Sequence, residues 1–169
     1  MDSSWYEIEE FCAAAKRNDT AALQLTLDMQ GSYIANSADS AGDTALTWAA
    51  WYGHVESMAL LLDYGADINL KGVRGRTALA WAVEGNKKEA VALLMSRGAD
   101  INVKDDDGKT PLQSARDKGF TEIGDLIEGV TAAQKAEIRR KQEEEAGKTL
   151  AAQRLQELKK LKPPKIKGF

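Results

Sequence analysis

The sequence predicts an all-α solenoid of about four helix-turn-helix repeats, followed by a long charged helix. Segments 39–71 and 72–104 align without gaps at a period of 33 residues, with about half of their positions identical. Beyond residue 130 the repeats stop, and the chain becomes rich in Ala, Glu, Lys, Gln and Arg. A repeat of this length cannot bury an apolar face alone, so neighbouring copies are expected to stack into one elongated core.

The first repeat, about residues 5–38, is a degenerate copy whose residues 11–27 align with 46–62. Ser4 and Glu7 form a capping-box pattern at its start. A terminal repeat faces water on one side, so its outer surface should be polar. The residues expected there are Glu7, Glu9, Glu10, Lys16, Arg17 and Asp19.

The second and third repeats, 39–71 and 72–104, each contain two predicted helices. Thr44 and Thr77 are suited to cap the first helix, which should end at Gly53 and Asn86 respectively. Apolar residues spaced i, i+3, i+4 predict the second helix; they are Met58, Leu61 and Leu62, and then Val91, Leu94 and Met95. Gly65 and Gly98 end these helices, and Gly-containing turns then predict short projecting hairpins.

The fourth repeat, 105–130, is cut short at its end. Thr110 is its predicted helix cap, Pro111 its first-turn proline, and Gly119 the end of that helix. Its outer face should also be polar. The residues expected there are Arg116, Asp117, Lys118, Glu122, Asp125 and Glu128.

These repeated residues resemble the ankyrin repeat over about residues 5–130. The resemblance rests on the G-x-T-[AP]-L starts, the G-H pair at Gly53 and His54, and the G-A-D-I-N endings at 65–69 and 98–102. It implies a β-turn finger and two antiparallel helices in each repeat. It also implies protein binding, since most members of this family bind proteins and very few are enzymes.

The side chains available for catalysis or metal binding are few. His54 and Cys12 are the only histidine and cysteine, which excludes a zinc site of four such ligands. We expect a structural hydrogen bond from His54 and a buried thiol at Cys12. The acidic run 105–107 lacks the ligand spacing of a calcium loop. No nucleotide-binding or nucleophile motif occurs, so we expect no enzyme, no metal and no cofactor.

The resemblance also implies a binding surface, made of hairpin tips and the exposed ends of the first helices. Carried over by position, the partner-binding residues are Lys16, Arg17, Trp51, Tyr52, Arg74, Arg76, Glu84, Asp106, Lys109, Asp117 and Lys118, with Ser40, Ala41, Asp43, Val73, Gly85 and Asp107 at equivalent places. Trp51 and Tyr52 are the expected anchors, because these residue types dominate interfaces. Tyr64 is a candidate extension of this patch.

Two alternatives concern the aromatic residues. Trp51 and Tyr52 could instead cover a neighbouring repeat or the appended helix. Trp48 and Trp81 recur in phase at a position usually filled by Leu, so we expect them to be buried or partly buried. Arg74 and Arg76 are expected to steer acidic groups of the partner toward Trp51 and Tyr52.

The repeats are acidic and the remainder of the chain is basic. Residues 1–130 carry 12 basic and 21 acidic side chains, whereas residues 131–169 carry 11 basic and 5 acidic ones, and the net charge of the whole chain is −3. We expect a helix over 131–162 and an unstructured basic tail over 163–169. The helix ends in an apolar stripe of Leu150, Leu155, Leu158 and Leu161, which could dock on a partner, dock on the repeats or pair as a coiled coil.

The basic end of the chain comprises Lys159, Lys160, Lys162, Lys165 and Lys167. It suits an acidic protein, a cytoskeletal surface such as tubulin, nucleic acid or anionic lipid, although the acidic repeats disfavour nucleic acid and membrane. The alternative is a solvated tail without a partner. No apolar stretch approaches the roughly 20 residues of a membrane span. We therefore expect a cytoplasmic adaptor or structural subunit, with nuclear or cytoskeletal association left open. The alternative is a small ankyrin inhibitor of an enzyme or transcription factor.

Overall fold

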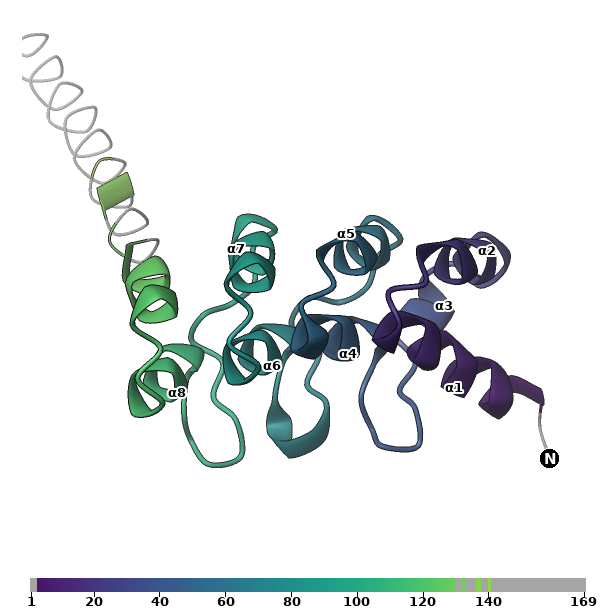
Figure 1. Cartoon of the computed structure of the whole chain (residues 1–169), viewed down its shortest axis with the longest axis horizontal. Coiled ribbons are helices and arrows are strands. Elements are labelled where there is room, and N and C mark those ends of the chain that lie inside the picture. The colour runs from purple at the N-terminus through teal and green to yellow at the C-terminus, as the bar shows by residue number, and fades with distance from the viewer. Residues whose placement is uncertain (1–2, 130–131, 133–135, 138–139, 141–169) are drawn as a thin grey trace, which may run out of the picture. The chain divides into compact units, whose positions relative to one another are not determined.

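The computed structural model describes residues 3–129, 132, 136–137 and 140. It divides into two compact units, Met1–Glu128 and Gly129–Phe169. Within the first unit, antiparallel helix pairs stack side by side in two layers, and hairpin loops project from the inner layer (Figure 1). The described residues contain no strand, only an isolated antiparallel bridge between Ala38 and Thr44. The predicted all-α ankyrin-type solenoid is confirmed.

Each layer contributes one helix to every repeat. The inner layer comprises α1 (Ser3–Lys16), α4 (Ala45–Tyr52), α6 (Ala78–Glu84) and α8 (Pro111–Asp117). The outer layer comprises α2 (Thr20–Gln30), α5 (Val55–Asp63), α7 (Lys88–Ser96) and the helical residues 121–128. The first repeat adds the short α3 (Ser32–Ala35), and the third repeat has the 3-10 turn η1 (Val73–Gly75) at its hairpin.

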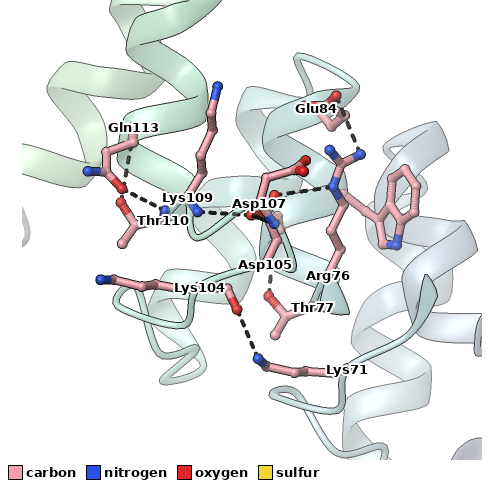
Figure 2. A network of polar contacts seen from close by, with 12 residues as sticks. Lys71, Arg76, Thr77, Glu84, Lys104, Asp105, Asp107, Lys109, Thr110 and Gln113 are labelled. Carbon is pink, nitrogen blue, oxygen red and sulfur yellow. Dashed lines mark hydrogen bonds and ion pairs between the residues drawn. The ribbon is translucent and has the colours of Figure 1, made fainter. Parts of the chain in front are cut away.

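The predicted threonine caps are confirmed. The hydroxyls of Thr44, Thr77 and Thr110 each accept a hydrogen bond from the backbone N–H three residues on, at 3.3, 3.4 and 3.3 Å. Thr110 also forms a full capping box, because the Gln113 side chain accepts from the Thr110 backbone N–H at 2.9 Å (Figure 2). Such a cap contributes about 1 kcal/mol to helix stability. It fixes the starts of α4, α6 and α8 directly after their threonines.

The predicted ends of the inner helices are confirmed as well. Gly53 and Gly119 have φ of 81° and 73°, and Asn86 has φ of 54° in the middle repeat. These left-handed positions turn the chain sharply, so the outer helix runs back antiparallel to the inner one.

The core runs through the stack as one cluster. Its fully buried large side chains include Leu46 and Leu79 on inner helices and Met58, Leu61 and Leu94 on outer ones. The inner helices pack on one another in order, α1 on α4, α4 on α6 and α6 on α8. Neighbouring repeats therefore supply the apolar contacts that a single repeat lacks.

Asparagine side chains link consecutive repeats. The Asn36 amide donates to the Gly65 carbonyl at 3.0 Å, and its oxygen accepts from the Asp67 N–H at 2.7 Å. Asn69, at the equivalent place, accepts from the Asp100 N–H at 2.8 Å. The recurring Asn of the G-A-D-I-N ending thus satisfies backbone groups of the following repeat.

The two ends of the stack differ. The outer face of the fourth repeat is exposed and polar, as expected. The expectation of a polar first repeat is wrong in part, because Tyr6, Leu25 and Met29 are exposed beside Glu7 and Glu10. These side chains line a groove of about 250 Å³ between α1 and α2. All of the residues that line this groove belong to α1 and α2.

The second unit is described at four residues beyond Gly129. Residues 132, 136, 137 and 140 are helical, and Arg140 pairs with Glu137 at 2.9 Å, three residues apart. The predicted stripe of Leu150, Leu155, Leu158 and Leu161 lies outside the described residues. The predicted basic tail of Lys159, Lys160, Lys162, Lys165 and Lys167 lies outside them too.

Candidate partner-binding surface

Aromatic side chains cluster where α4 meets α6. The Trp51 ring meets the Trp81 ring edge to face, with centroids 5.4 Å apart and planes at 88°. Trp48 stacks with Tyr52 at 6.4 Å, and Tyr52 stacks with His54 at 5.7 Å. Offset and edge-to-face arrangements are those that aromatic rings prefer. The cluster is therefore a pre-formed surface on the inner layer.

Exposure within this cluster differs from the prediction. Tyr52 is 45% exposed, as expected for an anchor. Trp51 is partly buried, because its ring packs against Trp81 of the next repeat. This contact agrees with the alternative interpretation, in which Trp51 covers a neighbouring repeat. Trp48 and Trp81 are partly buried, as the sequence predicts.

A small hollow lies within the cluster, with a volume of about 250 Å³. It is lined by Asp43, Thr47, Trp48, Trp51 and Trp81, and we call it the tryptophan hollow. Its wall is largely aromatic, and its charged group is the Asp43 carboxylate.

Two buried aspartates orient the tryptophans. The Trp48 indole N–H donates to Asp39 Oδ2 at 2.8 Å, and the Trp81 indole N–H donates to Asp43 Oδ1 at 3.2 Å. Asp43 Oδ1 also accepts from the Val73 backbone N–H at 3.2 Å. The expectation that Asp43 is an exposed hairpin residue is wrong: it is 5% exposed, because these donors hold it inside.

A glycine makes room for Asp43. Asp39 and Asp105 occupy equivalent places in the second and fourth repeats, where the third repeat has Gly72. A Cβ atom on Gly72 would lie 2.2 Å from Asp43 Oδ1, closer than any real contact. Asp43 therefore reaches Trp81 only because the third repeat lacks a side chain there. This break in the 33-residue pattern is the sequence signal that could have revealed the role of Asp43.

Burial raises the pKa of the Asp43 carboxyl, while hydrogen bonds from the Val73 backbone and the Trp81 indole act to lower it. Burial is the larger effect, because few water molecules reach the carboxylate. A positive group entering the tryptophan hollow would favour the ionised form of this carboxyl.

Lys16 covers the second-repeat side of the cluster. Its ammonium lies 3.9 Å from the centroid of the Trp48 ring and 3.2 Å from Asp39 Oδ2. The Lys16 carbonyl is also within hydrogen-bonding distance of His54 Nε2, at 3.1 Å. The structural hydrogen bond expected of His54 is confirmed, and it ties α1 to the end of α4.

Arg76 covers the other side. Its guanidinium lies 5.0 Å from the Trp81 ring centroid and pairs with Glu84 and Asp105, each at 3.5 Å (Figure 2). The Glu84 carboxylate also pairs with the Lys118 ammonium, at 3.2 Å. The Arg76 side chain is only 11% exposed, so its charge already has acidic partners inside the chain. Of the two arginines predicted to steer a partner, Arg74 remains exposed.

Most of the remaining predicted hairpin and helix-end residues are exposed, but Val73 and Gly85 are only partly so. The Arg74 carbonyl accepts from the Asp106 N–H at 3.0 Å, which links the third and fourth hairpins. Lys109 pairs with Asp117 at 2.6 Å, and this hydrogen bond raises the pKa of the Lys109 ammonium. Solvent screens an exposed pair of this kind, so a partner could exchange it at little energetic cost.

Two predicted residues lie away from the cluster. Arg17 is exposed and pairs with Glu10 of α1 at 2.8 Å. Tyr64 follows α5 in the outer layer, where its hydroxyl hydrogen-bonds Asp28 and Gln24 of α2. Since α5 runs antiparallel to α4, Tyr64 lies at the opposite end of the repeat from Tyr52. It does not extend the aromatic patch.

Cys12 is a buried thiol, as expected, and its Sγ donates to the Asp43 carbonyl at 3.9 Å. Burial raises the pKa of this thiol to about 12. Across the described residues, no three His, Cys, Asp or Glu side chains are grouped to hold a metal ion. No helix in the same residues is long and apolar enough to cross a bilayer.

The Cys12 thiol is expected to react with an aromatic disulfide reagent at least about a hundredfold more slowly in the native protein than in urea, because only the thiolate attacks. Absorbance of the released thiol measures the rate. A native rate equal to the unfolded rate would contradict the burial of Cys12.

Comparison with known proteins supports the repeat assignment. Two stretches, residues 11–72 and 71–136, match the family model described as ankyrin repeats in three copies. No curated protein gives a significant match to the chain. Ankyrin repeats act as protein–protein interaction modules, and the family is generally non-enzymatic. The matches cover well over half of the sequence, and this chain is therefore a member of the ankyrin repeat family.

Proposed function

We propose that the protein is an adaptor or structural subunit that holds a partner protein on the inner-layer surface centred on Tyr52 and the tryptophan hollow. Residues 131–169 would connect this complex to a second component. The observation that carries the proposal is a pre-formed cluster of four aromatic side chains, Trp48, Trp51, Tyr52 and Trp81, beside an open hollow.

Rigid aromatic clusters of this kind suit binding. Tyr and Trp supply a large contact area at a low entropic cost, and they are enriched among the residues that dominate interfaces. Here ring stacking and the indole hydrogen bonds to Asp39 and Asp43 hold the rings before any partner arrives. A partner would therefore meet a surface that needs little reordering.

The Tyr52→Ala variant tests the proposal. A partner identified by cross-linking and affinity purification should bind this variant at least about tenfold more weakly than the wild type in calorimetric titration. Tyr33→Ala is the matched control, because Tyr33 is 70% exposed on α3, outside the cluster. Both variants should keep the wild-type circular dichroism spectrum. Equal affinities for wild type and Tyr52→Ala would rule out this surface as the binding face.

A second candidate function is a small inhibitor that acts through the repeats alone. It is favoured by the compactness of Met1–Glu128 as a separate unit. Deleting residues 131–169 separates the two functions. An adaptor should keep the first partner but lose incorporation into the assembly, whereas an inhibitor should retain its full effect on its target.

The basic end of the chain adds a charge-dependent contact to the adaptor proposal. With Lys159, Lys160, Lys162, Lys165 and Lys167 close together in sequence, the fitting surface is an acidic protein, including a cytoskeletal one. This contact should weaken steeply with added salt, because exposed charges are screened. Pull-down at low and high salt, with and without residues 159–169, measures it.

A further inference from the structure

We infer that the tryptophan hollow receives a methylated lysine side chain of the partner protein. This inference rests on the proposed function, since it names the chemistry that the inner-layer surface would recognise. It is argued from the size, the lining and the charge of the hollow.

The size of the hollow suits one side chain. Pockets for drug-sized ligands measure about 300–1,000 Å³, and the tryptophan hollow measures about 250 Å³. Three indole rings, from Trp48, Trp51 and Trp81, form most of its wall. An occupant must therefore be narrow and largely apolar at its surface.

The same rings already attract cations within the chain. The Lys16 ammonium lies 3.9 Å from the Trp48 ring centroid, and the Arg76 guanidinium lies 5.0 Å from that of Trp81. A tryptophan face attracts positive charge through its quadrupole, and the attraction grows when water is excluded. Neither Lys16 nor Arg76 lines the hollow, so its interior is open to a further cation.

The charge of the hollow points the same way. Around the cluster, Asp39 pairs with Lys16, and Glu84 and Asp105 pair with Arg76. None of the ion pairs found among the described residues includes Asp43. Its carboxylate lines the hollow, held by neutral N–H donors. A cation in the hollow would supply the missing counter-charge.

Methylation decides which cation fits. An unmodified lysine ammonium carries three N–H donors, and burying them without acceptors is costly. The indole N–H groups only donate, and the Thr47 hydroxyl already donates to the Thr44 carbonyl at 2.7 Å. Asp43 is thus the main acceptor in the wall. Methyl groups replace the N–H donors with apolar surface that the rings can cover, while the positive charge remains.

The test is a titration of the full chain with three blocked amino acids, in which tryptophan fluorescence reports binding. These are Nα-acetyl-trimethyllysine amide, the corresponding unmodified lysine amide, and a neutral isostere in which carbon replaces the ammonium nitrogen. The trimethylated form should bind at least tenfold more tightly than either of the others. Equal binding of the neutral isostere would overturn the inference, because the hollow would then select shape without charge.

Variants and a free cation complete the test. Asp43→Asn keeps an oxygen that can accept from Trp81 but removes the charge, and it should weaken trimethyllysine binding at least tenfold. Trp5→Phe, at an exposed position on α1, is the control and should bind like the wild type. Binding of tetramethylammonium without binding of trimethyllysine would also overturn the inference, since the hollow would then take a free small cation.

The two proposals can fail separately. If Tyr52→Ala weakens the partner complex but the wild type shows no preference for trimethyllysine, the surface binds a partner and the inference about methylation is wrong. If trimethyllysine binds but Tyr52→Ala leaves the partner complex unchanged, the hollow is a cation site and the proposed binding face is wrong.

Discussion

Replacing Leu79 by alanine is expected to lower the free energy of unfolding by about 2–5 kcal/mol. Leu79 is fully buried on α6, the inner helix that packs on α4, α7 and α8. Truncation removes buried methyl groups and leaves a cavity in the middle of the stack, where helices on three sides limit collapse. Urea denaturation followed by circular dichroism measures the change.

Leu25→Ala is the matched control for this prediction. Leu25 is 65% exposed on α2, so the same substitution there should change the free energy of unfolding by less than about 0.5 kcal/mol. Because every repeat depends on its neighbours, loss of Leu79 should destabilise the whole first unit rather than one repeat. Equal effects of Leu79→Ala and Leu25→Ala would contradict the described core.

The second large effect is expected from Gly85→Ala, which should lower the free energy of unfolding by about 1–3 kcal/mol. A Cβ atom on Gly85 would lie 2.6 Å from the Trp51 carbonyl oxygen, which is backbone and cannot rotate away. The added methyl would push α6 away from α4. Since Trp51 and Trp81 touch across that junction, binding at the tryptophan hollow should weaken as well.

Gly124→Ala is the control for Gly85→Ala. Gly124 lies within helical residues 121–128, and an added Cβ there would meet no atom of the described residues within 4 Å. Alanine should therefore stabilise this helix by up to about 1 kcal/mol. Thermal unfolding of the two variants gives the comparison. A stabilised Gly85→Ala protein would show that the close approach of α4 and α6 is not as described.

The exposed positions of the candidate binding surface could largely be predicted from the repeat alone. The positions of Tyr52, Arg74, Lys109 and Asp117 on exposed hairpins and helix ends follow from the 33-residue period, and the structure places them there. The period could not reveal that Arg76 is paired inside the chain. Its partners Glu84 and Asp105 lie at positions where the repeat pattern predicts exposed side chains.

The sequence by itself determined the repeat, the helices and their ends. These depend on local signals, namely threonine caps, glycine or asparagine at left-handed positions, and apolar residues spaced for one helical face. Each such signal acts within a few residues of the chain. Thr77, Asn86 and Leu94 are therefore where the pattern predicts them to be.

Only the tertiary structure decided how the aromatic residues and their aspartates combine. The Trp51 ring contacts Trp81, 30 residues away in sequence, and Asp43 bonds the Trp81 indole 38 residues on. Those contacts depend on the side-chain rotamers and on how closely α6 stacks on α4. They also depend on Gly72, whose missing side chain breaks the repeat pattern. The spacing along the chain shows that Gly72 stands where the second and fourth repeats have aspartate. The stacked helices show that the Asp43 side chain fills the space.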